Sequence, residues 1–372
     1  MTLGRISPLP VIAVLALVAL ALGSARAADV FEVRNVPVDV TAETAAKARE
    51  QAHARGEAEA FRRLLERLTL EEDRDRLPEL TTEEITTYVS DFAVSDEKTS
   101  SVRYLAKLHV RFKPDPVRSF LRSLGVRFAE TPSKPILVLP VYQSAGGSVL
   151  WEDSNPWRNA WNLRRAREGL VQLALPLGDL GDISAVNVQQ AVRGDIDRLS
   201  GLALRYNAGD TIVAYARLGL NPGTVSRRVD VSVVRFSPHR EPETDLLALS
   251  QQADESEEAL LVRAADEVAV RIEDSWKREN LLSHDGEGIT AVTVPITSLK
   301  DWLDVKERLG GVAIVRRLEV ILLSLDEVRV NLHYVGAPGQ LQTALGQADL
   351  ALVREDEDWV LYPAGGQPPG KS

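Results

Sequence analysis

The absence of cysteine constrains the fold of this chain more than any other property of its sequence. None of the 372 residues is a cysteine, so disulfides, thiol nucleophiles and cysteinyl metal sites are excluded. A folded state must therefore be stabilised by the burial of apolar side chains, and 44% of the residues are hydrophobic. A chain of this length predicts two or three domains.

Residues 1–27 have the pattern of a secretory signal peptide. An early arginine precedes an apolar run from Val11 to Leu22, and the small residues Ala25 and Ala27 precede the predicted cleavage site. The run is shorter than the roughly 20 residues that span a bilayer. Without cysteine no lipid can be attached at the cleavage site. We therefore expect cleavage before Ala28, a periplasmic location and no stable membrane insertion afterwards.

The chain is acidic, which limits its partners. It has 54 acidic and 44 basic residues and a formal net charge of −10. Nucleic-acid binding depends on a concentrated basic face, so we expect no nucleic-acid partner. Export also separates the chain from the nucleotide cofactors of the cytoplasm, and we predict no cofactor.

Strand and helix patterns predict an α/β and α+β fold made of three small mixed-sheet modules. The first, residues 28–130, has the order βαββα. Its long helix is expected to begin at Thr41 or Thr44 and to run through Leu68. One face of this helix begins with small residues, which allow a helix to lie close to a sheet, and ends with large ones: Ala48, Ala52, Gly56, Ala60, Leu64 and Leu68.

The remaining modules are predicted from residues 135–282 and 288–363. The second has the order βαβαββα, with a helix over 184–206, and its first strand is continuously apolar, as is typical of a strand buried on both faces. The third has the ferredoxin-like order βαββαβ. Its first helix is expected to begin after Ser298 and to end at Gly310. Residues 364–372, rich in glycine and proline, are expected to be disordered.

Two modules resemble domains of known exported proteins. The runs Val36–Val40 and Tyr88–Phe92 make the first module similar to the amino-terminal domain of the flagellar assembly T-protein. The runs Ile136–Pro140 and Leu202–Asp210 make the second similar to the amino-terminal domain of the Tol-system β-propeller protein. The mature chain as a whole resembles an exported bacterial family of unknown function. These resemblances imply an envelope setting and contact between proteins, and they carry over no catalytic residue.

Two short motifs match enzyme signatures without the structural context that those signatures need. Gly365–Ser372 fits the phosphate-binding pattern G-x-x-x-x-G-K-[ST], but no residues follow to form the required helix. Ser95–Lys98 fits the S-x-x-K of penicillin-binding proteins, where serine and lysine face each other across a helical turn. Here the four residues are expected to cross from a strand into a hairpin turn. We interpret both matches as coincidental.

Histidines and acidic runs give no metal-binding pattern. The acidic runs Glu71–Asp73 and Glu355–Asp358 lack the glycine-punctuated spacing of a calcium loop. The five histidines have no paired spacing and are interpreted as surface residues: His53, His109, His239, His284 and His333. We predict no metal site and no catalytic set. A hydrolase site assembled from distant carboxylates stays an open alternative, because carboxylates are abundant and unspecific.

The strongest candidate site is a segment with three of the six tryptophans. Trp157 and Trp161 are four residues apart on a predicted helix and share a face, with Trp151 in the preceding loop. Indoles beside charged groups can stack on sugars or bind an apolar partner. The candidate surface comprises Trp151, Glu152, Asp153, Asn155, Trp157, Arg158 and Trp161. The alternative is that the indoles pack against the second module's sheet and that Asn155 only caps the helix.

Two functions are compatible with these observations. The first is a periplasmic, non-enzymatic accessory or adaptor protein of the cell envelope that acts through contacts with a protein partner. The alternative is a periplasmic protein that binds a glycan or peptidoglycan fragment through the segment Trp151–Trp161. The accessibility of the indoles discriminates between them, because a sugar-stacking site needs an exposed ring face.

Overall fold

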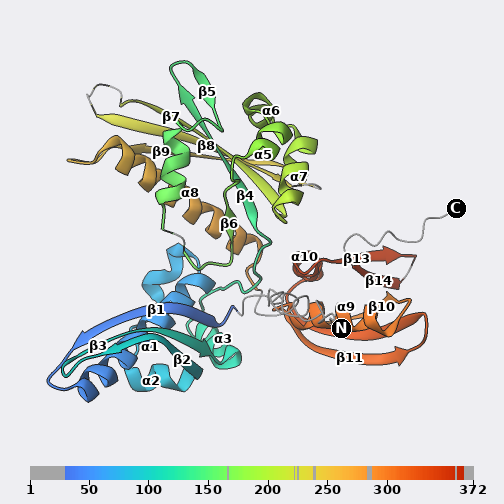
Figure 1. The fold of residues 1–372 in the computed structure, drawn as a ribbon. Coiled ribbons are helices and arrows are strands. Elements are labelled where there is room, and N and C mark those ends of the chain that lie inside the picture. The colour runs from blue at the N-terminus through green and yellow to red at the C-terminus, as the bar shows by residue number, and fades with distance from the viewer. Residues whose placement is uncertain are drawn as a thin grey trace, which may run out of the picture.

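The computed structural model describes residues 30–165, 167–221, 223, 226–237, 240–282, 287–356 and 358–363. The predicted signal peptide, the predicted disordered tail and the Gly365–Ser372 motif lie outside these residues. Three sheets with packed helices confirm the predicted fold class. Figure 1 shows one sheet in each of three modules, with the second module above the first and the third.

The first module is an antiparallel sheet of order β1-β3-β2 covered by one long helix. Thr44 caps this helix by accepting a hydrogen bond from Lys47 N. A Cβ atom added to Gly56 would lie 2.2 Å from the side chain of Leu108, so the glycine permits the close contact between helix and sheet. The elements are β1 (Glu32–Thr41), α1 (Ala45–Leu68), η2 (Glu71–Arg76), α2 (Thr82–Tyr88), β2 (Val89–Thr99), β3 (Arg103–Phe112) and α3 (Pro114–Ser123).

The second module is a mixed sheet of order β5-β4-β7-β8-β9 with β6 beside β4. Strands β4 and β7 are parallel, and β8 and β9 continue the sheet antiparallel. Helices α4 and α8 cover one face, and α5 to α7 cover part of the other. The elements are β4 (Ile136–Ser144), β5 (Gly147–Val149), α4 (Pro156–Leu163), β6 (Leu173–Ala174), α5 (Leu180–Ala185), α6 (Val188–Arg193), α7 (Ile196–Arg205), β7 (Asp210–Leu220), β8 (Arg227–Ser237), β9 (Arg240–Ser250) and α8 (Glu257–Glu279).

Two features of this module differ from the sequence prediction. The single helix predicted over 184–206 is divided among α5, α6 and α7, because Asn187 caps α6 and Gly194 ends it with a φ of 71°. Strand β9 was not predicted, because it begins with charged residues and a proline, which are typical of loops. An edge strand tolerates such residues, since one side of its backbone needs no partner.

The third module is a five-stranded sheet of order β11-β12-β10-β14-β13. In a ferredoxin-like order the last strand lies beside the first. Here the terminal hairpin places β14 beside β10, in parallel, and moves β13 to the edge. The elements are β10 (Glu287–Pro295), α9 (Leu299–Gly310), β11 (Val315–Leu323), β12 (Glu327–Val335), α10 (Pro338–Gln347), β13 (Leu350–Glu355) and β14 (Asp358–Pro363).

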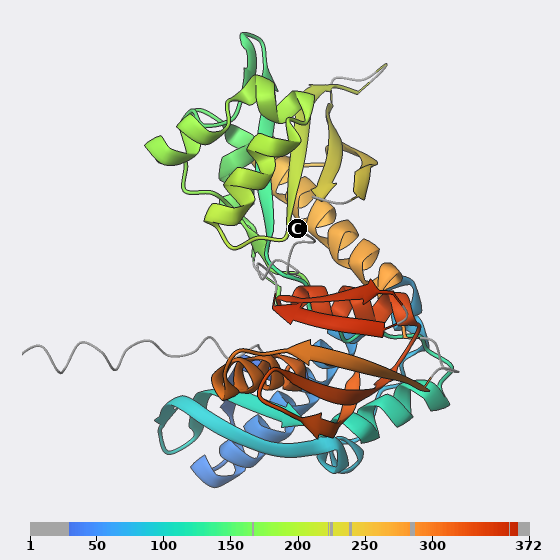
Figure 2. The same ribbon diagram turned by 90° about the vertical axis from the view of Figure 1, so that its right-hand side faces the viewer.

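The hydrophobic cores connect the first and third modules. One cluster of buried apolar residues extends through both of them, whereas the second module has a separate cluster on each face of its sheet. In Figure 2 the long helix α8 runs from the second sheet down to the other two modules. Within the described ranges, no helix has both the length and the apolar character that crossing a membrane requires.

Candidate docking surface

The tryptophans of the candidate segment belong mainly to the core. Trp157 is fully buried and Trp161 is 2% exposed, and their rings meet edge to face 5.8 Å apart between the sheet and α8. The Trp157 indole also donates a hydrogen bond of 2.9 Å to Ala214 O. The prediction that these two indoles form a binding surface is therefore wrong, because both lie on the side of α4 that faces the sheet and α8.

Asn155 is a helix cap, which was the alternative interpretation of this residue. Its side-chain oxygen accepts hydrogen bonds of 3.0 Å from the backbone N–H groups of Trp157 and Arg158, which caps α4. Its amide group donates to Pro140 O at 2.9 Å and to Leu150 O at 3.2 Å. Asn155 is completely buried, so it is a structural cap and not part of an accessible surface.

Two other residues of the segment hold a neighbouring loop in place. Trp151 Nε1 donates 2.7 Å to Val186 O, just after α5. Arg158 Nη2 donates 2.5 Å to Leu177 O, and its guanidinium lies against Gly178, where an added Cβ atom would come within 2.6 Å. Glu152 and Asp153 are exposed beside them. Part of the predicted site thus supports the segment before and through α5.

This segment and the nearby helix α7 carry the most exposed leucines on the α5–α7 side of the second module. Leu177, Leu180 and Leu204 are 74%, 82% and 78% exposed, and we call these three residues the leucine patch. Leu180 and Leu204 are the chain neighbours of Asp179 and Arg205, which pair at 2.5 Å. Isolated exposed leucines are ordinary, but several of them next to an ion pair have the composition of a protein interface.

A buried carboxylate fixes the backbone of the leucine patch. Asp182 is completely buried, and it accepts hydrogen bonds from Gly178 N at 2.8 Å and from the Tyr206 hydroxyl at 2.6 Å. Arg205 Nη1 lies 3.4 Å from its other oxygen. Burial, followed by the hydrogen bond to Asp182, raises the pKa of Tyr206. These contacts join α5 to the end of α7, so the patch is a defined surface.

The leucine patch was not predicted from the sequence, although one signal was present. Helix α7 buries Leu199, Leu202 and Ala203 on one face, and Leu204 lies off that face. The same test was not possible for Leu177 and Leu180, because the predicted helix began only at Ser184.

The Ser95 motif does not form the arrangement that its sequence match suggests. Ser95 and Lys98 both lie on the extended strand β2. Ser95 Oγ is 2.9 Å from His109 Nε2, while His109 Nδ1 faces the Asn35 N–H at 3.5 Å. An Nδ1 that accepts a hydrogen bond leaves the proton of a neutral ring on Nε2. That nitrogen then donates to Ser95, which is opposite to the role of a general base.

The other polar candidates remain separate. His333 pairs with Glu319 at 3.2 Å on the outer face of the third sheet. His239 and His284 lie outside the described residues. In the part of the chain that the structure describes, no three histidine or carboxylate side chains are grouped as metal ligands.

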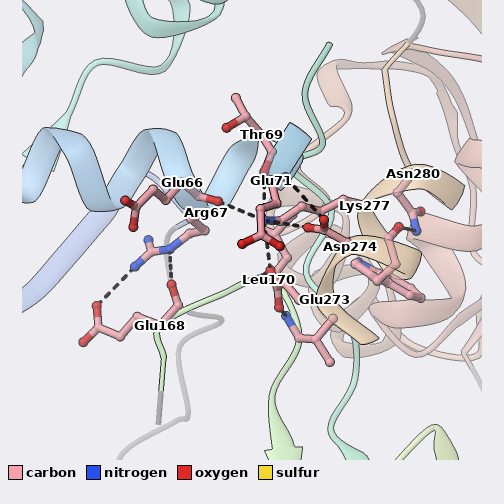
Figure 3. A network of polar contacts seen from close by, with 12 residues as sticks. Glu66, Arg67, Thr69, Glu71, Glu168, Leu170, Glu273, Asp274, Lys277 and Asn280 are labelled. Carbon is pink, nitrogen blue, oxygen red and sulfur yellow. Dashed lines mark hydrogen bonds and ion pairs between the residues drawn. The ribbon is translucent and has the colours of Figure 1, made fainter. Parts of the chain in front are cut away.

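A buried polar network, which we call the module junction, joins α8 to the first module (Figure 3). Lys277 is 1% exposed, and its Nζ donates to Glu66 O at 2.8 Å and to Thr69 O at 2.9 Å. These carbonyls lie at the carboxyl end of α1, where the helix dipole favours a positive charge. A lysine of the second module therefore caps a helix of the first.

Carboxylates around Lys277 complete this part of the module junction. Glu273 and Asp274 lie 3.8 Å and 3.9 Å from Lys277 Nζ. Glu273 also accepts from Leu170 N at 2.7 Å, and Asp274 accepts from Glu71 N at 3.3 Å. Burial lowers the pKa of Lys277 and raises the pKa of Glu273, while their mutual attraction acts in the opposite direction. Each buried charge thus depends on partners from another segment.

Two arginine contacts extend the module junction. Arg67 of α1 donates to Glu168 O at 2.9 Å and to Val30 O at 2.6 Å, and Figure 3 shows it directed at Glu168. Glu130 is completely buried and pairs with Arg118 of the first module and Arg316 of the third. Buried polar groups of this kind are costly unless all their partners are in place. The network therefore favours one arrangement of the three modules.

Comparisons with known proteins identify one domain. Residues 32–130, in the first module, match a domain of unknown function (DUF8605). No curated protein matches the chain. Among solved structures, the chain is similar to the PelC dodecamer of Paraburkholderia phytofirmans, with 10% identity and a TM-score of 0.25 over 38% of this chain and 90% of that one. The resemblances to the flagellar and Tol-system domains stay predictions.

Proposed function

We propose that this protein is a non-enzymatic adaptor of the bacterial cell envelope that acts in the periplasm and docks a partner protein on the leucine patch. The observation that supports this most directly is that three leucines, 74–82% exposed, belong to the two segments that the Asp179–Arg205 ion pair joins. Interfaces combine an apolar centre with a polar rim. The partner is expected to present an apolar surface with charged groups at its margin.

The support beneath the leucine patch favours docking over a role as a flexible loop. Buried Asp182 holds α5 against the end of α7, and Arg158 holds the backbone at Leu177. A surface that is already ordered loses little conformational entropy when a partner binds. The periplasmic setting is supported by the predicted signal peptide and by the resemblance of the first two modules to envelope proteins.

Site-specific photocrosslinking in intact cells tests this proposal. A photoreactive residue is introduced at Leu177, Leu180 or Leu204, and at Leu246 as the control. Leu246 is also 71% exposed and belongs to the same module, but it lies on the edge strand β9. The three patch positions should give one common adduct that is absent at Leu246.

The proposal fails if the patch positions give no adduct, or if Leu246 gives the same adducts as they do. A charge introduced by Leu204→Glu should abolish the adduct at Leu180 without changing the amount of protein. Recovery of the processed chain in the periplasmic fraction tests the proposed location separately.

A further inference from the structure

Helix α7 carries a glycine in the middle of its exposed face. Gly201 is the sixth of the ten residues of α7, and it is exposed. Apart from the local backbone of α7, no described atom would lie within 4 Å of an added Cβ, and the φ angle of Gly201 is not positive. Glycine weakens the interior of a helix, whereas alanine strengthens it. Within the described residues, neither packing nor backbone conformation accounts for this glycine.

The other glycines of the described helices have a reason for their position. Gly56 lies inside α1, where an added Cβ atom would be 2.2 Å from the side chain of Leu108. Four more lie in the first or last turn of a helix, where the helix frays and glycine costs less: Gly181, Gly310, Gly339 and Gly346. Gly201 therefore differs from all of them, since it lies inside its helix and faces open space.

The side chains around Gly201 leave a notch on the outer face of α7. Residues three and four apart are neighbours on a helix surface. Asp197 and Arg198 lie one turn before Gly201, and Leu204 and Arg205 lie one turn after it; all four are exposed. Side chains thus extend on both sides of a position where the helix backbone is bare. Leu204 belongs to the leucine patch, so the notch is continuous with the patch.

We propose that the partner docked on the leucine patch presents a helix, and that this helix crosses α7 at Gly201. This inference rests on the proposed function and specifies the partner. Helices pack by placing the side chains of one in the grooves of the other, with their axes roughly 8–10 Å apart. Glycine is used where another backbone has to approach closely. The missing Cβ of Gly201 lets a crossing helix lie deeper between the side chains on either side.

The chemistry of α7 favours a helix over an extended segment of the partner. An extended segment binds by adding a strand to a sheet edge, whereas the backbone groups around Gly201 are already paired within α7. A second helix needs only the shape of the notch and the side chains at its rim. Among the described residues, neither Asp197 nor Arg198 forms an ion pair within this chain. The partner helix is therefore expected to be amphipathic, with an apolar face against Leu204 and charges of both signs at its margin.

Substitution of Gly201 in intact cells tests the crossing, with a photoreactive residue at Leu180 as the probe. Gly201→Ala should lower the yield of the Leu180 adduct about fivefold or more, because the added methyl group holds the two helices apart. The thermal midpoint of the purified variant should equal or exceed that of the wild type, because alanine favours the helix. The control Gly346→Ala in α10 also adds a Cβ with no described atom outside its local backbone within 4 Å, and should leave the adduct unchanged.

The attachment sites on the partner test its secondary structure. Photoreactive residues at Asp197 and Leu204 lie on the two sides of the notch. Mass spectrometry should locate both adducts in one segment of the partner, at positions three, four or seven residues apart, as on one face of a helix. Attachment sites two residues apart are the pattern of an extended strand and would overturn the proposal.

Three further results would overturn it. A Leu180 adduct that keeps its yield in Gly201→Ala excludes the crossing at Gly201 and leaves docking on the leucine patch intact. Adducts formed with a second copy of this chain replace the partner by a dimer. A wild-type protein without any adduct at Leu180 overturns this proposal together with the proposed function.

Discussion

The tryptophans of α4 and the leucine patch lie in the same module, fewer than 50 residues apart, and have opposite roles. Trp157 and Trp161 are 0% and 2% exposed, whereas the three leucines are 74–82% exposed. Tryptophan has the stronger preference for interfaces, yet here it fills the core. The surface that is open to a partner is built from leucines, which have the weaker preference for interfaces.

The direction of each side chain on its helix explains this difference. On one face α4 packs on the sheet beside the 23-residue helix α8, and its tryptophans lie on the buried side of α4. On the other face lie the helices α5 to α7, with 6, 6 and 10 residues, and Leu204 lies off the buried face of α7. Side chains directed away from the sheet on that face remain in contact with solvent.

The largest effect on stability is expected for Trp157→Ala. Loss of this buried indole and of its hydrogen bond to Ala214 O should lower the free energy of unfolding by about 3–5 kcal/mol. Leu204→Ala, at a position 78% exposed, should change it by less than about 0.5 kcal/mol. Urea denaturation measures both. Equal losses in the two variants would contradict the contrast between core and patch.

Buried and exposed lysines can be compared in the same way, with the buried one at the module junction. Lys277→Met removes the cation that contacts Glu273, Asp274 and the end of α1, and should cost about 3 kcal/mol. The matched control is Lys47→Met, whose side chain is 57% exposed in an i,i+4 ion pair and should cost at most about 0.5 kcal/mol.

Limited proteolysis tests whether the module junction holds the modules together, which a free energy of unfolding alone does not show. In the Lys277→Met variant, cleavage near residues 131–135 should become faster than in the Lys47→Met variant. Equal cleavage rates would show that the module junction does not fix the modules.

A smaller difference in stability is expected between two asparagines that both cap helices. Asn155 and Asn187 both cap helices, but Asn155 is buried and also donates to two backbone carbonyls, whereas Asn187 is exposed. Asn155→Ala should lower the free energy of unfolding by about 2 kcal/mol, and Asn187→Ala by about 1 kcal/mol. Thermal unfolding of both variants measures the difference, and an inverted order would show that burial does not control the cost.

The smallest effect on stability should accompany the largest effect on docking. Leu180→Ser changes a side chain that is 82% exposed and should alter the free energy of unfolding by less than about 0.5 kcal/mol. The same variant should lose the adduct formed from a photoreactive residue at Leu177. A stable variant that keeps the adduct would remove Leu180 from the docking surface.

Local signals predicted most elements of the fold. The helix of the first module begins after Thr44, and α9 begins after Ser298, because hydroxyl side chains at these positions accept backbone hydrogen bonds. Strand β9 was missed because its first residues are charged and include a proline, which only its place at a sheet edge makes acceptable. The division of 184–206 was missed although Asn187 and Gly194 are both boundary residues.

Sequence alone determined the local features of this protein: the periodicity of its helices and strands, the caps, the absence of disulfides and the pattern of a signal peptide. These depend on residues that are close along the chain, so neighbouring side chains are sufficient to predict them. The tertiary structure decided which apolar residues are covered. It enclosed Trp157 and Trp161, exposed the leucine patch and placed Lys277 against a helix end 208 residues away from it in sequence. Burial depends on elements distant in sequence, and their packing is not encoded in any one segment.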